Sequence, residues 1–144
     1  MVDRDLLTAK LVELSDRVDR IRLRLPDSAS ALAADRDALD LVSFNLMLSV
    51  QVCADVASHL IADEGWMPAN SLAEGFTRLE QNGVLAASTA ESLRRAVGLR
   101  NVVAHGYARL DVRRAFLAAS TGTLDLEAFA REVSAWAEGG SDPR

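Results

Sequence analysis

The sequence predicts an all-α protein, a bundle of four or five helices that run up and down. Apolar residues recur at spacings of three and four along most of the chain, and no alternating apolar run is long enough for a strand. The 8 glycines and 3 prolines of this 144-residue chain stand mainly between these stretches, where helices are expected to end. Apolar residues make up 49% of the chain, which is enough for one domain with a buried core.

The first helix is marked by an apolar stripe near the N-terminus. Its members follow one another at spacings of four and three: Leu7, Leu11, Leu14, Val18, Ile21 and Leu25. Such spacing places all of them on one helix face. Pro26 should end this helix, because the residue before a proline is disfavoured in the helical region.

A second, longer helix is expected from about Asp35 to Asp63, with Gly65 closing it. One of its faces carries an apolar row made of Leu39, Val42, Leu46, Ser49, Cys53, Val56 and Leu60. A second row lies beside the first and consists of Leu41, Leu48 and Val52. A single neighbouring helix would cover only the first row, so the second row suggests contact with another subunit.

Two shorter helices are predicted from capping boxes. Ser71 with Glu74, and Ser88 with Glu91, have the spacing at which a serine accepts an unpaired N–H of the first turn. The helices that they open should run to about residues 82 and 104.

A fifth helical region is expected over residues 111–136, with a break near Thr121-Gly122. We therefore assign residues 1–137 to one helical domain. Residues 138–144 are polar and contain Gly-Gly, so they are expected to form a flexible C-terminal tail.

The chain is expected to be cytoplasmic and not to span a membrane. Its single cysteine, Cys53, excludes a disulfide within the chain and a cysteine-based zinc site, and it fits a reducing compartment. Polar residues interrupt the most apolar segment, residues 39–62, so this segment is expected to be a buried helix. The first five residues lack the apolar stretch of a signal peptide.

Charge is unevenly distributed along the chain. The net charge of −5 argues against broad, non-specific binding of nucleic acid. Between residues 94 and 114, however, there are six arginines (94, 95, 100, 109, 113 and 114) and only one acidic residue, Asp111. This stretch is compatible with a solvated arginine face and with a contact to nucleic acid.

The segment Arg100 to Tyr107 carries the side chains best suited to chemistry. On a helix Arg100 and Tyr107 would share one face, while Asn101 and His105 would share the adjacent face, where the amide could orient the imidazole. Gly106 is suited to end the helix directly after His105. A guanidinium can stabilise charge on a phosphate in transition, and a histidine can move a proton, so the pair suits phosphodiester chemistry. A helix cap and a core histidine are the structural alternative.

This segment resembles the signature of HEPN domains, and more narrowly the HepT form Arg-x4-His-x-Tyr, matched by Arg100, His105 and Tyr107. Asn101 stands where that family usually has a polar residue. The resemblance continues in residues 50–60, 68–79 and 82–85. It implies an all-α HEPN fold and a homodimer in which two such motifs face each other across one cleft. It also implies RNA cleavage without metal or cofactor, with the ribose 2′-hydroxyl as nucleophile, Arg100 and His105 as catalytic residues, and Asn101 and Tyr107 as supporting residues.

The resemblance also implies a partner, an MntA-like nucleotidyltransferase antitoxin of a type VII-like toxin–antitoxin system. Such a partner inactivates the toxin by transferring AMP to the motif tyrosine, here Tyr107. From the run of arginines described above, Arg94, Arg95 and Arg109 are expected to help bind the RNA. A non-catalytic dimeric HEPN module that binds the nucleotidyltransferase is the alternative function.

One position departs from the family pattern. Gln51 stands where many HepT-like chains have an acidic residue, and it forms a polar stripe with Asp55 and His59 that could border the cleft. We expect Asp55 and His59 to form an intrahelical pair. Trp66 and Trp136 are expected to be packing residues.

Overall fold

The structure, a computed structural model, describes residues 3–140, and all regular secondary structure in this range is helical. The prediction of an all-α fold is confirmed. The helices of ten or more residues are α1 (Arg4–Arg24), α3 (Arg36–Glu64), α4 (Leu72–Gln81), α5 (Ala87–His105) and α7 (Thr123–Gly140). The shorter elements are α2 (Ala29–Ala34), the 3₁₀ turn η1 (Tyr107–Arg109), α6 (Val112–Leu117) and the π-helical segment η2 (Ala118–Gly122). Of these, α2 and η1 were not predicted.

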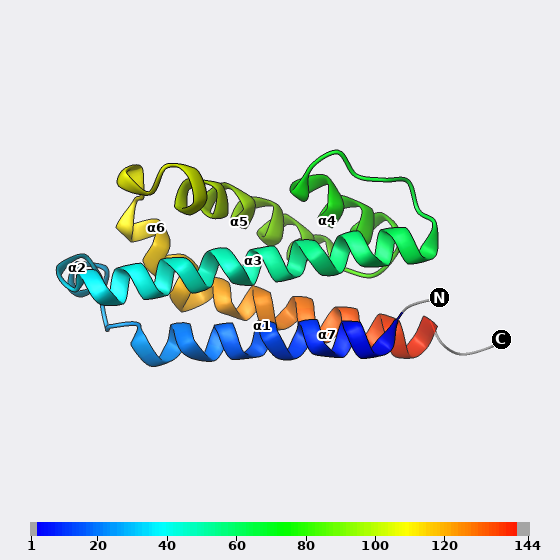
Figure 1. Cartoon of the computed structure of the whole chain (residues 1–144), viewed down its shortest axis with the longest axis horizontal. Coiled ribbons are helices and arrows are strands. Elements are labelled where there is room, and N and C mark those ends of the chain that lie inside the picture. Colours follow the sequence, from blue (N-terminus) through cyan, green and yellow to red (C-terminus); the bar gives the residue numbers. More distant parts are fainter. Residues whose placement is uncertain (1–2, 141–144) are drawn as a thin grey trace.

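Helix α3 runs through the middle of the bundle (Figure 1). Helices α1 and α7 lie along one side of it, and α5 and α4 lie along the other. Helices α2 and α6 meet at one end of the molecule, while α1 begins and α7 ends at the opposite end.

Most of the predicted helix ends are confirmed. Helix α1 stops one residue before Leu25-Pro26, and α3 starts after Asp35, whose side chain accepts the N–H of Ala38 at 3.0 Å. Gly65 closes α3 with a φ of 68°, a left-handed conformation in which glycine is favoured. Ser71 caps α4 by accepting the N–H of Glu74 at 3.1 Å.

The capping box predicted at Ser88 and Glu91 is wrong. Helix α5 begins at Ala87, and its cap residue Ala86 provides no side-chain hydrogen bond. Instead Glu132 of α7 accepts the N–H of Ala86 and the hydroxyl of Thr89, both at 2.7 Å. A carboxylate from a distant helix thus replaces the local cap, and it also ties α5 to α7.

Residues 111–140 form a more continuous helical stretch than expected. In place of the break predicted near Thr121-Gly122, the π-helical η2 joins α6 to α7. The hydroxyls of Ser120, Thr121 and Thr123 each donate to a carbonyl four residues earlier. Helix α7 continues to Gly140, so the first three residues of the expected tail are helical, and the remaining four lie outside the described residues.

The interior contains two apolar clusters. The larger one joins α1, α3, α4, α5 and α7, and at its centre the rings of Phe76 and Phe129 meet edge to face at 6.1 Å. Trp66 and Trp136 contact each other in the same way at 5.7 Å, which confirms that they are packing residues. The smaller cluster lies near α2 and α6 and comprises Ile21, Leu32, Ala38, Val42, Leu46 and Ala119.

By length and composition α3 could cross a membrane. However, 61% of its most apolar 18-residue stretch is buried, as in the core helix of a bundle.

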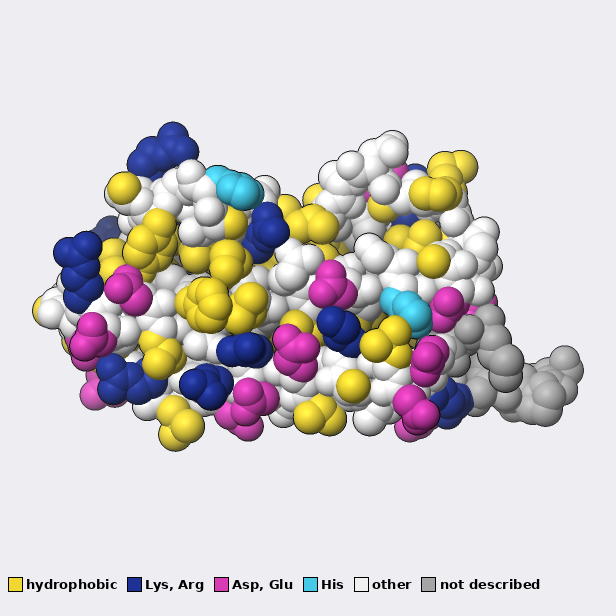
Figure 2. Space-filling view, in the orientation of Figure 1, with side chains coloured by type: hydrophobic (Ala, Val, Ile, Leu, Met, Phe, Trp, Pro, Cys, Tyr) yellow, Lys and Arg dark blue, Asp and Glu magenta, His cyan; other side chains and the backbone are white. Residues whose placement is uncertain are grey.

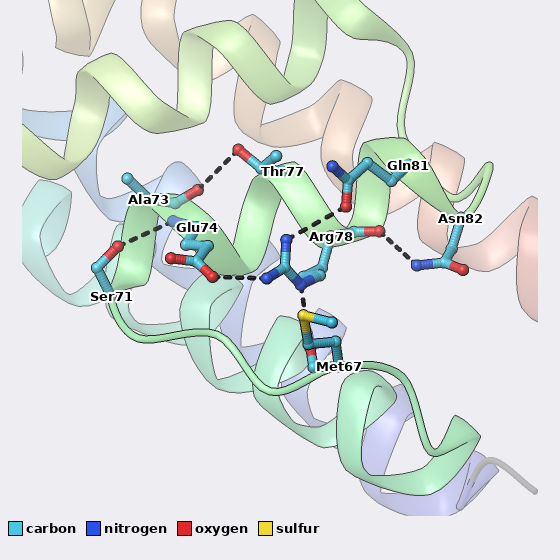
Figure 3. Close-up of polar contacts among 8 residues, drawn as sticks. All are labelled: Met67, Ser71, Ala73, Glu74, Thr77, Arg78, Gln81 and Asn82. Atoms are coloured by element: carbon cyan, nitrogen blue, oxygen red, sulfur yellow. Dashed lines mark hydrogen bonds and ion pairs between the residues drawn. The ribbon is translucent and has the colours of Figure 1, made fainter.

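The surface of α4 is held by a local polar network (Figure 3). The guanidinium of Arg78 lies at its centre and donates to Glu74 at 2.6 Å, to the carbonyl of Met67 at 3.0 Å and to Gln81 at 3.3 Å. This network fixes the loop between α3 and α4 against the start of α4.

Candidate active site

The motif residues stand where α5 ends. The N–H of Gly106 donates to the carbonyl of Val102 at 2.8 Å, and the chain then turns into η1. The φ of Gly106 is −151°, so this glycine is not required by a left-handed backbone. A Cβ there would lie 2.8 Å from Nη2 of Arg109, so the missing side chain makes room for that guanidinium.

Arg100 is held by neutral groups. Its Nη2 donates to Oε1 of Gln51 at 2.9 Å, and its Nη1 donates to Oδ1 of Asn101 at 3.0 Å. Gln51 is in turn fixed by its Nε2, which donates to Asp55 at 3.0 Å, and Lys10 forms an ion pair with that carboxylate at 3.5 Å. Because both acceptors of Arg100 are amides, its positive charge is oriented but not neutralised. An oriented, uncompensated guanidinium suits a phosphate group.

His105 is exposed, and its imidazole makes no hydrogen bond within the part of the chain that the structure describes. The expectation that Asn101 orients this imidazole is therefore wrong for the single subunit, because the Asn101 oxygen accepts from Arg100. Five residues on an α-helix turn by about 140°, so Arg100 and His105 point in different directions around α5. One subunit presents both groups on neighbouring surfaces without joining them.

The prediction that Tyr107 shares a helix face with Arg100 is wrong, because α5 ends at His105 and Tyr107 lies in η1. Its hydroxyl instead donates to Oδ1 of Asp40 on α3 at 2.5 Å, across 67 residues of sequence. Its partial burial, followed by this hydrogen bond, raises the pKa of the Tyr107 phenol. The residue is still 37% exposed, so it lies at the surface of the molecule.

Four of the arginines that follow Arg94 border a groove of about 610 Å³ between α3, α5, η1, α6, η2 and the start of α7. Arg95, Arg100, Arg109 and Arg114 line it together with Asp111 and Asp125, and much of its remaining wall is apolar. Arg94 lies elsewhere: it forms an ion pair with Glu80 of α4 at 3.0 Å and donates to Thr77 at 3.3 Å. Arg114 was not among the residues predicted to bind RNA.

An exposed apolar surface lies on α3 near the motif. Phe44 is 50% exposed, and Leu41, Met47 and Leu48 are partly exposed. Figure 2 shows apolar side chains gathered over the half of α3 nearer to α2 and α6. The predicted second row is thus partly correct, because Leu41 and Leu48 belong to this surface, whereas Val52 is 3% exposed and belongs to the core. Phe44, which the row omitted, is its most exposed member.

The polar stripe on α3 has other partners than expected. His59 pairs with Asp63 at 3.1 Å, and Asp55 pairs with Lys10 and Gln51, so the predicted pair of Asp55 with His59 is wrong.

Cys53 is completely buried, and this burial raises the pKa of its thiol, as is typical of a structural cysteine. Within residues 3–140, His, Cys, Asp and Glu side chains form no group of three or more that could hold a metal ion.

An all-helical bundle that presents Arg-x4-His-x-Tyr at the end of one helix is a HEPN-type domain. The chain matches the ribonuclease HepT-like family over residues 14–133, and it belongs to this family. It is 28% identical to the mRNA nuclease HepT of Shewanella oneidensis over 108 residues, which are 75% of this chain and 80% of that protein.

Solved structures are similar over nearly the whole chain. One is a toxin–antitoxin with AMP-PNP, with a TM-score of 0.86 and 25% identity over 91% of this chain and 98% of that one. Another is a tri-AMPylated Shewanella oneidensis HEPN toxin in complex with its MNT antitoxin, with a TM-score of 0.85 and 26% identity over 94% and 99% of the two chains.

Proposed function

We propose that this chain is a metal-independent endoribonuclease toxin of a type VII-like toxin–antitoxin system. The observation that carries the proposal is the end of α5, which presents both a guanidinium held only by amides and an exposed histidine, in a member of the HepT-like family. The relationship to an mRNA nuclease supports RNA as the substrate, and the reducing cytoplasm is the expected location.

The reaction needs only groups that the chain and the RNA supply. The ribose 2′-oxygen bonds to the adjacent phosphorus, and the bond from phosphorus to the departing 5′-oxygen breaks, which leaves a cyclic phosphate. One His105 takes the proton from the 2′-hydroxyl, and a second His105 gives a proton to the 5′-oxygen. Arg100 binds the phosphate and stabilises the charge that develops on its oxygens.

Two subunits would complete this site. Because Arg100 and His105 point in different directions around α5, a two-fold axis that brings two motifs together can set the histidine of one beside the arginine of the other. The exposed apolar surface around Phe44 supports such a homodimer, since it adjoins the motif and is uncovered in the single chain.

The groove beside α5 is a suitable path for the RNA strand. Arg95, Arg109 and Arg114 line it and make no ion pair within residues 3–140, so their charges are available to phosphates. Arg100 lines the same groove, which connects this path to the scissile phosphate. Arg94 contributes less in this arrangement, because Glu80 already neutralises it.

An MntA-like nucleotidyltransferase would inactivate the enzyme by transferring AMP to Tyr107. The tri-AMPylated toxin with a similar fold supports this regulation. Tyr107 is the only tyrosine of the chain, and this residue is partly exposed just beyond the end of α5. The added adenylate would bring bulk and negative charge close to the end of α5, and so would oppose the binding of RNA there.

The test is RNA cleavage in EDTA by the wild type and by Arg100→Ala, His105→Ala and His59→Ala. The chain has two histidines, so His59→Ala is a matched control. It removes an imidazole that pairs with Asp63 on α3 and leaves the motif intact. We expect a loss of about 100-fold or more for both motif variants, as for removal of a proton-transfer or charge-stabilising group. Circular dichroism and thermal melting check that each variant is folded.

Growth after induction in a bacterial host gives the second readout, and only the wild type and His59→Ala should arrest it. A wild type that is harmless and leaves RNA intact would contradict the nuclease, and the non-catalytic module that binds a nucleotidyltransferase would then be the better description. The dimer is tested separately with Phe44→Glu, which should give monomers in analytical ultracentrifugation and abolish cleavage. A monomeric wild type that cleaves RNA would contradict the shared site.

A further inference from the structure

The contact between Tyr107 and Asp40 has no role in RNA cleavage as derived above. It joins two elements that are far apart in sequence, since Asp40 lies one turn into α3 and Tyr107 begins η1. The backbone of η1 is itself fixed, because Arg109 and Leu110 donate to the carbonyls of Gly106 and Tyr107 at 2.8 and 3.0 Å. The carboxylate and the phenol are therefore held together by two ordered helical segments.

We propose that Asp40 accepts the proton of the Tyr107 hydroxyl when that oxygen takes up a nucleotide. The inference rests on the proposed regulation and names the residue of this chain that makes Tyr107 a nucleophile. A phenol is a weak nucleophile while it keeps its proton, and a carboxylate in hydrogen-bond contact is placed to remove that proton as the new bond forms. This hydrogen bond places the carboxylate within reach of the phenolic proton, as a general base requires.

The step balances with a nucleoside triphosphate as the second reactant. The Tyr107 oxygen bonds to the α-phosphorus of ATP, and the bond from that phosphorus to the oxygen bridging the β-phosphate breaks. Pyrophosphate leaves with the electron pair of the broken bond, and the phenolic proton passes to the carboxylate of Asp40. The products are the AMP ester of Tyr107 and pyrophosphate.

The surroundings of this pair suit the approach of a triphosphate. Asp40 is exposed and Tyr107 is partly exposed, so the pair lies at the surface of the molecule. Arg36, one turn before Asp40 on α3, acts electrostatically on Tyr107 and can offset the charge of incoming phosphates. Ser43 of α3 is the other side chain that acts on the phenol, and it carries no charge. The toxin thus contributes its own base to the reaction that silences it.

The experiment measures AMP transfer by intact mass, with the dimeric chain, the cognate MntA-like nucleotidyltransferase and ATP with magnesium. Asp40→Asn keeps an oxygen that accepts the phenolic hydrogen bond but cannot take up the proton. We expect its kcat at saturating ATP to fall about 100-fold or more, with little change in the KM for ATP. Asp40→Glu, which keeps a carboxylate, should recover most of the rate. Asp37→Asn, which removes the same charge one turn earlier on α3, is the matched control and should react like the wild type.

The outcomes separate this inference from the proposed function. If Tyr107 of the wild type is modified and Asp40→Asn is modified as fast, Asp40 is not the base, while regulation through Tyr107 stands. If Asp40→Asn and Asp40→Glu are equally slow, the side chain only positions the phenol and the inference is also wrong. If the wild type gains no AMP, or if Tyr107→Phe gains as much, the proposed regulation fails and the inference fails with it. Melting temperatures of all variants check that a slow rate does not come from a misfolded chain.

Discussion

The two sides of α5 use arginine in opposite ways. On the side that faces α4, Arg94 pairs with Glu80, and on α4 itself Arg78 pairs with Glu74 at 2.6 Å. On the side that faces the groove, Arg95 and Arg109 make no ion pair within residues 3–140, and Arg100 is held by amides alone. Arg94 and Arg95 are neighbours in the sequence, yet the helix sends them into different environments.

The difference distinguishes charges that hold the fold from charges available to a ligand. A guanidinium that is already neutralised and hydrogen-bonded gains little from a phosphate, because it would have to give up its present partner. One that is oriented by neutral groups can bind a phosphate without losing an ion pair. The groove side therefore carries the arginines that are available to a ligand, in a chain whose net charge is negative.

Apolar packing also differs between the α4 side of the molecule and the region near the motif. The larger cluster, beneath the α4 side, contains fully buried phenylalanines and the Trp66–Trp136 contact. The smaller cluster lies near the motif and consists of aliphatic residues and alanines, while Phe44 and Leu117 in that region remain exposed. Stability should therefore reside mainly in the first region and activity in the second.

The largest effect on stability is expected from Phe129→Ala. This ring is fully buried and meets Phe76 edge to face, so its removal should lower the free energy of unfolding by about 3–5 kcal/mol. Leu124→Ala on the same helix is the control, since Leu124 is 59% exposed and should cost about 0.5 kcal/mol or less. Urea unfolding at one protein concentration compares the two, and equal losses would show that α7 is not anchored through Phe129.

A negative charge introduced at position 51 should neutralise the Arg100 guanidinium while leaving the backbone around it unchanged. Gln51→Glu would form an ion pair with Arg100 in place of the present amide contact, and the phosphate would have to compete with it. We expect a KM for RNA about fivefold higher, because such a partly buried pair is worth on the order of 1 kcal/mol. The same substitution at the exposed Gln81 adds the same charge beside Arg78 and serves as the control.

An increase in KM that is equal in Gln51→Glu and Gln81→Glu would mean that only net charge matters, and the role given to the neutral amide would be wrong. The new carboxylate at position 51 would also face Asp55, which at present accepts from Gln51. Melting temperatures therefore accompany the kinetics, so that a loss of fold is not mistaken for a loss of affinity.

Arg94→Ala and Arg95→Ala test the difference between the α4 side and the groove side of α5, because these two arginines are adjacent in the sequence but lie on different sides. Arg94→Ala should lower stability by up to about 1 kcal/mol through loss of its ion pair, with little effect on RNA binding. Arg95→Ala should leave stability nearly unchanged, weaken RNA binding by a few-fold and reduce its salt dependence by about one phosphate contact. Fluorescence anisotropy with labelled RNA at several salt concentrations measures both, and the reverse pattern would overturn the assignment of the two sides.

The long helices and the motif could be predicted from the sequence because their signals are local. Apolar spacing, Pro26, Asp35, Gly65 and Ser71 fixed the ends of α1, α3 and α4 to within a residue or two. The start of α5 could not be predicted in this way. The group that satisfies it, Glu132, lies 46 residues beyond Ala86, and nothing near Ser88 indicates that a better acceptor will arrive from another helix.

The contacts inside the candidate site were out of reach for the same reason. Arg100 and Gln51 are 49 residues apart, so periodicity within α5 could identify the arginine but not its partner. The prediction for Tyr107 placed it on a helix that Gly106 ends, and so it missed Asp40 on α3. Motif spacing predicted the residues of the candidate site, and only the packing of α5 against α3 determined which groups each of them meets.

The smallest effect is expected in the titration of Tyr107, which reports on the contact of this phenol with Asp40 of α3. The chain has one tyrosine, so the rise in tyrosinate absorbance with pH follows this phenol alone. Burial and the hydrogen bond to Asp40 raise its pKa, so ionisation should begin at a higher pH than in the unfolded chain. A raised pKa means that the folded state holds this proton more tightly, so the associated stability is present below the unfolded pKa and is lost as pH rises through the folded pKa.

Asp40→Asn should bring the pKa of Tyr107 down toward its ordinary value without restoring it fully, because burial, the larger cause, remains. Asp37→Asn, which removes a charge from the same helix without touching the phenol, should leave the titration nearly as in the wild type. If both variants shift the titration equally, the phenol senses only the net charge of α3. If neither does, Asp40 does not hold the hydroxyl in solution, and a base for Tyr107 must come from the partner. A shift confined to Asp40→Asn would establish the contact independently of any nucleotidyltransferase.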